Sequence, residues 1–197
     1  MKAVKKESEI ARDRRFIMRA FDDIGFQLID LSHGNTIDID SHRVYAIAQE
    51  YCNTEYGVTF RQGGLLSGRQ RYTFSLLVCA EQIADMIQAA SRKVSTMGEK
   101  EQMYFLDLSE VFLAFGKGRI LQVRAMIDAL EGFLETHKLD NIEHDTACRA
   151  TLEALVRTLR ESATSRDNST PLWKGLKYRA RFISDNFSHK NPQIRFA

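Results

Sequence analysis

The stretch Met103-Tyr-Phe-Leu-Asp-Leu-Ser-Glu-Val-Phe-Leu-Ala-Phe115 decides the fold, because its apolar side chains fall on almost every face of a helix. A helix that is apolar nearly all round is normally buried at the centre of a helical bundle. We therefore predict a helix over residues 100–115, with Leu108 and Phe112 in the core. The fold class that follows is mainly α.

Amphipathic helices are predicted on both sides of this central segment. On the N-terminal side they cover residues 8–28, about 41–53 and 70–92, and on the C-terminal side 143–161. Between these, a 3-4-3-4 apolar spacing predicts a heptad-like seam of closely packed helices. The seam consists of Ile120, Val123, Ile127, Leu130 and Leu134. With a C-terminal helix, the sequence predicts a bundle of about six to seven helices.

One segment departs from the helical period. Near residues 26–40 the apolar side chains alternate, and His33-Gly34-Asn35 is typical of a turn. We expect a short hairpin or an irregular segment there. The organisation that results is a bundle core over residues 1–161 that includes the N-terminal helix, a polar linker over 162–171, and a basic amphipathic helix and tail over 172–197.

The composition fits a soluble globular protein. The 197 residues are 44% apolar and 27% charged with only 2 Pro, which excludes collagen-like, proline-rich and broadly disordered chains. Three separated cysteines without CxxC spacing predict neither a disulfide framework nor a zinc site, and a reducing cytoplasm is the simplest setting. No apolar run reaches the roughly 18 residues of a membrane span. We expect no membrane span and no cofactor.

Charge is distributed unevenly along the chain. Residues 1–19 carry seven Lys/Arg against three Asp/Glu, and residues 157–197 carry nine against three, so both ends are basic and the middle is acidic. Basic ends can fold back on an acidic centre, contact nucleic acid or another acidic partner, or join one copy to the next.

The best functional indication is a mixture of basic and aromatic side chains near the C-terminus. Such a mixture clamps phosphates while rings stack on bases. The residues are Trp173, Lys174, Lys177, Tyr178, Arg179 and Arg181. The structural alternative is that Trp173 belongs to the core and that the cations form a solvated face.

Two further clusters are weaker candidates. A glycine-rich segment could wrap an anion, although it lacks the GK[ST] ending of a P-loop and a plain loop explains it as well. Its residues are Arg61, Gly63, Gly64, Arg69 and Arg71. A group of Asp and His side chains could hold a metal ion or simply form a solvated turn, the reading we favour. These residues are Asp30, His33, Asp38, Asp40 and His42.

Catalytic motifs are absent from the sequence, including HExxH, GxSxG and kinase signatures. The consecutive residues Glu143-His144-Asp145 cannot form a relay among themselves, because adjacent helical residues point about 100° apart. They are better explained as the first turn of a helix.

Three functions remain open at this stage. The first is a non-enzymatic helical adaptor, regulator or assembly subunit that binds another protein or a second copy of itself. The alternative is nucleic-acid binding through the basic terminal helices. The third is a small metal-dependent enzyme that uses the residues between Asp30 and His42.

Overall fold

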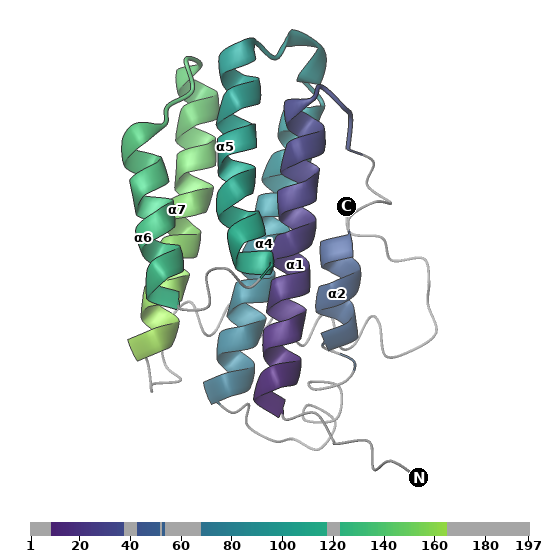
Figure 1. The fold of residues 1–197 in the computed structure, drawn as a ribbon, viewed down its shortest axis with the longest axis vertical. Helices are drawn as coiled ribbons and strands as arrows, with labels where there is room; N and C mark the ends of the chain where they lie inside the picture. The colour runs from purple at the N-terminus through teal and green to yellow at the C-terminus, as the bar shows by residue number, and fades with distance from the viewer. Residues whose placement is uncertain (1–8, 38–42, 52, 54–67, 118–122, 165–197) are drawn as a thin grey trace.

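The computed structural model describes residues 9–37, 43–51, 53, 68–117 and 123–164, which form a helical bundle (Figure 1). The elements are α1 (Glu9–Ser32), α2 (Arg43–Tyr51), α4 (Gly68–Ser91), a short 3-10 helix η3 (Val94–Thr96), α5 (Glu99–Gly116), α6 (Val123–Thr136) and α7 (Ile142–Thr164). The described residues contain six α-helices and no strand, which confirms the predicted mainly α class.

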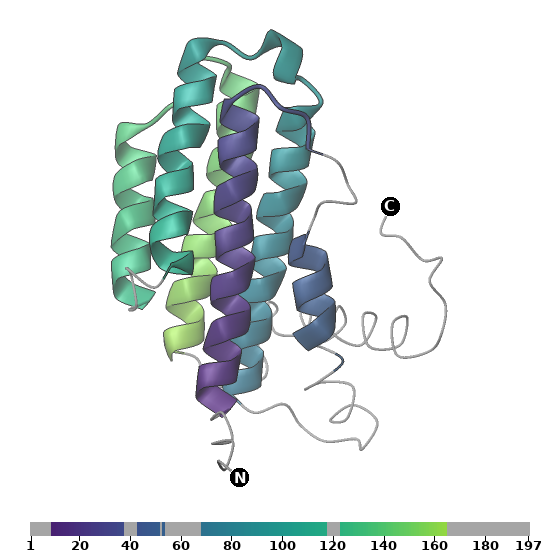
Figure 2. The same ribbon diagram turned by 45° about the vertical axis from the view of Figure 1, so that its right-hand side comes forward.

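Five long helices stand side by side around the core. Going round the bundle, α1 is followed by α5, α6, α7 and α4, and α4 returns to α1. The short helix α2 packs on the outside against α1 and α4 (Figure 2). An ion pair of 3.1 Å between Arg19 and Glu50 joins α2 to α1.

Two core residues predicted for α5 are confirmed, but the helix is one member of the ring and not its enclosed centre, because Met103 on α5 is 48% exposed. Leu108 and Phe112 are both fully buried. The Phe112 ring stacks on Phe21 of α1 at 5.6 Å, and Phe115 meets the same ring edge-on at 5.2 Å. Burying a side chain of this size stabilises the fold by roughly 1.5–3 kcal/mol. These aromatic contacts therefore fix the pairing of α1 with α5.

Two glycines let α1 and α5 approach closely. A Cβ atom at Gly116 would lie 2.6 Å from the backbone of Asp22, and one at Gly25 would lie 2.5 Å from the Leu113 side chain. Because real Cβ atoms do not come this close to other heavy atoms, only glycine fits at these two positions without a shift. The contact points also show that α1 and α5 run antiparallel.

Residues 26–32 do not belong to the hairpin or irregular segment predicted for residues 26–40. Residues 38–40 lie outside the described residues. Residues 26–32 continue α1, because Leu28 and Leu31 extend the buried stripe and are fully buried. The helix ends at Ser32, and Gly34 follows with a φ of 79°, which is readily adopted only by glycine. The Gly34 amide donates a hydrogen bond to the Leu31 carbonyl, and the Asn35 amide donates one to the Asp30 carbonyl. Together these two bonds form a Schellman cap. The turn residues were therefore recognised correctly, but they end a helix instead of joining two strands.

Two further predictions about helices change in detail. The buried seam of α6 consists of Met126, Leu130, Phe133 and Leu134, whereas Ile127 is only partly buried. Ile120 lies outside the described residues. At the C-terminal side, α7 continues to Thr164, so the first three residues of the expected linker are helical.

Candidate functional site

The candidate site is a pocket of about 530 Å³ between α4 and α7, here called the α4/α7 pocket. Its floor is apolar and consists of three buried residues: Phe105 of α5, Leu139 between α6 and α7, and Cys148 of α7. Met86 and Met97 are partly buried at its sides. Ligand pockets in proteins commonly have volumes of roughly 300–1,000 Å³ and form between the helices of bundles.

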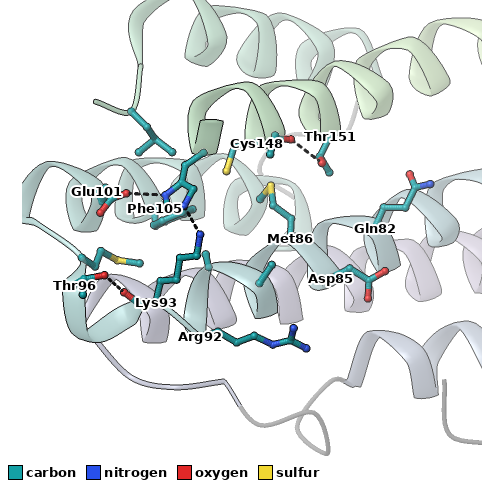
Figure 3. A pocket seen from close by; sticks show the side chains of 16 residues that line it. Gln82, Asp85, Met86, Arg92, Lys93, Thr96, Glu101, Phe105, Cys148 and Thr151 are labelled. Carbon is teal, nitrogen blue, oxygen red and sulfur yellow. Dashed lines mark hydrogen bonds and ion pairs between the residues drawn. The ribbon is translucent and has the colours of Figure 1, made fainter. Parts of the chain in front are cut away.

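The pocket lies toward one end of the α4 and α7 pair. The two helices pack against each other, with Cys79 of α4 near Thr158 of α7. The pocket residues lie further toward the C-terminus of α4 and the N-terminus of α7, from Gln82 to Lys93 and from His144 to Thr151. Since α5 begins at this end, its residues Glu101 and Phe105 reach the same space (Figure 3).

A chain of polar contacts crosses the mouth of the pocket. The Lys93 ammonium lies 2.8 Å from Nε2 of His144. Because an ammonium can only donate, this nitrogen must accept, and the ring proton therefore sits on Nδ1. Nδ1 lies 3.4 Å from Oε1 of Glu101, to which it donates. Lys93 follows α4 and Glu101 belongs to α5, so the two side chains come from separate elements (Figure 3).

Local helix caps place the members of this chain. Asn141 accepts the amide of His144 at 3.0 Å, which is the N-cap bond that starts α7. Oε2 of Glu101 accepts the amide of Gly98 at 3.3 Å at the start of α5. The Lys93 carbonyl accepts the Thr96 hydroxyl at 2.9 Å and so ties the end of α4 to η3. The positions of His144 and Glu101 thus follow from how their helices begin.

The thiol in the pocket is held in its neutral form. Burial, followed by the nearby carboxylates Asp145 and Glu101, raises the pKa of Cys148 from 9.0 to about 12. A protonated thiol is a poor nucleophile and a poor metal ligand. Cys148 is therefore suited to forming part of an apolar wall.

The structure describes only some of the residues of the sites that the sequence predicts. Arg69 and Arg71 belong to the first turn of α4 and not to a loop, which corrects the expected extent of the glycine-rich anion segment. Arg61, Gly63 and Gly64 lie outside the described residues. So does the whole basic and aromatic group, namely Trp173, Lys174, Lys177, Tyr178, Arg179 and Arg181.

Only two of the five candidate metal ligands lie within the described residues. Asp30 lies on the exposed face of α1 and His33 follows its end, while Asp38, Asp40 and His42 lie outside the described residues. Within the ranges that the structure describes, no three His, Cys, Asp or Glu side chains gather as metal ligands would. Over the same ranges no helix has the length and hydropathy needed to cross a membrane.

No local pattern in the sequence indicates the pocket, although one of its residues, His144, stands in a predicted helix start. Glu143, His144 and Asp145 form the first turn of α7, as predicted. The partners of His144 are instead Lys93 and Glu101, 51 and 43 residues away in the chain. No local sequence pattern encodes contacts across such separations.

Comparison with known proteins gives no further guidance, since no family model, no curated protein and no solved structure matches this chain.

Proposed function

We propose that this chain is a non-enzymatic binding protein, a regulator or adaptor, that takes up a small apolar molecule in the α4/α7 pocket. The observation that carries the proposal is the pocket itself, with an apolar buried floor and polar side chains that are all exposed or only partly buried. Pockets of this kind bind ligands by burying apolar surface while a few polar groups set the orientation. The raised pKa of the Cys148 thiol supports binding over nucleophilic catalysis.

Filling the pocket should abolish uptake of an apolar probe. We expect the neutral fluorophore N-phenyl-naphthylamine to bind the wild-type protein with a rise in emission, and Ala147→Trp to lose this rise. Ala147 lines the pocket from α7, and an indole at this position occupies the space that the probe needs. Direct excitation of the fluorophore in a titration measures the effect.

A matched control lies on the same helix. Ala150 is exposed on α7 and is not part of the pocket lining, so Ala150→Trp should bind the probe as the wild type does. Equal binding by the wild type and by both variants would show that the probe binds elsewhere, and the proposal would then fail.

The proposal also includes the class of partner to which the protein binds. We propose that the regulator or adaptor acts on another protein or on a second copy of this chain, the partner class that the sequence favours. On size-exclusion chromatography with light scattering, we expect no salt-sensitive complex with a short mixed nucleic acid at roughly 50 and 300 mM salt. A complex that forms at low salt and is lost at high salt would instead support the nucleic-acid alternative and Lys174, Lys177 and Arg181.

A further inference from the structure

The carboxylates at the pocket mouth already accept hydrogen bonds from uncharged groups. The Tyr45 hydroxyl of α2 donates to Asp85. Glu101 accepts from the Gly98 amide and from the His144 ring. These contacts satisfy oxygen atoms of both carboxylates without using a cation of the pocket.

Neither cation of the pocket has an acidic partner within the part of the chain that the structure describes. Lys93 contacts the uncharged imidazole of His144, and among the described residues neither Lys93 nor Arg92 forms an ion pair within 4.0 Å. Figure 3 shows the Lys93 side chain directed across the mouth toward α7, whereas Arg92 extends along the rim. The mouth therefore offers one inward-directed ammonium group that an anion would complement.

Among the described lining residues, those that are buried carry no charge, whereas Asp85 is exposed and Glu101 is only partly buried. Met86, Phe105 and Leu139 are hydrocarbon or thioether surfaces, and the Cys148 thiol is neutral because burial raises its pKa. Methionine side chains adapt readily to the shape of what they contact. A molecule with a flexible apolar body and a single negative end matches this arrangement.

We infer that the ligand of the α4/α7 pocket is an apolar monocarboxylate, with its carboxylate on Lys93 and its hydrocarbon body against Met86, Phe105 and Leu139. The inference rests on the proposed function, since it names the ligand class of the same pocket. A carboxylate at Lys93 forms a hydrogen bond in which donor and acceptor are both charged, and the His144 ring does not supply that negative charge.

The test compares three probes that share one hydrocarbon chain and differ in the charge of the end group. Isothermal titration calorimetry should give affinities in the order decanoate, decanol, decylamine, because Lys93 attracts the first and repels the last. Lys93→Gln should weaken decanoate by about three- to tenfold, since Lys93 is exposed to solvent, and leave decanol unchanged. Lys100→Gln is the control, because Lys100 pairs with Asp140 and does not line the pocket.

The outcomes separate the two proposals. Equal affinities for decanoate and decanol, or no effect of Lys93→Gln on decanoate, would overturn the carboxylate assignment while leaving an apolar binding pocket in place. Absence of binding by all three probes, together with probe fluorescence that Ala147→Trp does not change, would overturn the assignment and the proposed function together.

Discussion

Raising the pH from about 8 to about 11 should lower the free energy of unfolding by roughly 3–5 kcal/mol, because two buried thiols resist ionisation in the folded state. Burial raises the pKa of Cys79 from 9.0 to about 11, although a hydrogen bond from Thr158 opposes the shift. Burial and nearby carboxylates raise that of Cys148 to about 12.

The sign follows from comparing the two states. Below pH 9.0 both thiols are protonated whether the chain is folded or unfolded, so the stability is fully present. Above this pH the unfolded chain ionises first and is stabilised by about 1.4 kcal/mol per pH unit for each thiol. The loss levels off as the pH passes each folded-state pKa. Burial also raises the pKa of Tyr104, which adds to the loss in the same direction.

Urea unfolding in the presence of a reducing agent, repeated across this pH range, measures the effect. The double variant Cys79→Ala/Cys148→Ala is the control, since it lacks both groups and should show a much shallower decline above pH 9.0. An equally steep decline in the double variant would show that other groups cause it. The two cavities that the variant creates lower its stability at every pH and do not affect the slope.

Replacing Gly116 by alanine should lower the free energy of unfolding by about 2–3 kcal/mol, within the range for overpacked positions. The added Cβ would lie 2.6 Å from the backbone of Asp22, and backbone cannot move aside as the end of a flexible side chain can. The two helices must separate to make room, which weakens the contacts among Phe21, Phe112 and Phe115.

The matched control is the same substitution at Gly132 of α6. Nothing lies within 4 Å of a Cβ there, so Gly132→Ala should raise stability by up to about 1 kcal/mol through helix propensity alone. Chemical denaturation of the two variants beside the wild type tests both signs. A Gly116→Ala variant as stable as the wild type would mean that α1 and α5 are not as close as the structure places them.

The sequence predicted most of the helices because their apolar side chains recur at the helical period. In α5 the pattern predicts burial of Leu108 and Phe112, and both residues are buried. Burial on all sides does not follow, since Met103 of the same helix is 48% exposed. The end of α1 differs from the prediction, because Leu28 and Leu31 continue the buried stripe past the point at which the local pattern changes. Tertiary burial outweighed the local turn and strand signals at that point.

The candidate site, by contrast, depends on the tertiary structure. Lys93, Glu101 and His144 come from the end of one helix and the beginnings of two others, and none is unusual in its own sequence context. Only the antiparallel packing of α4 and α7, with the start of α5 beside them, brings these groups to one pocket mouth. Periodicity along the chain determines which face of each helix is buried. Packing in three dimensions determines which helices become neighbours and how much space remains between them.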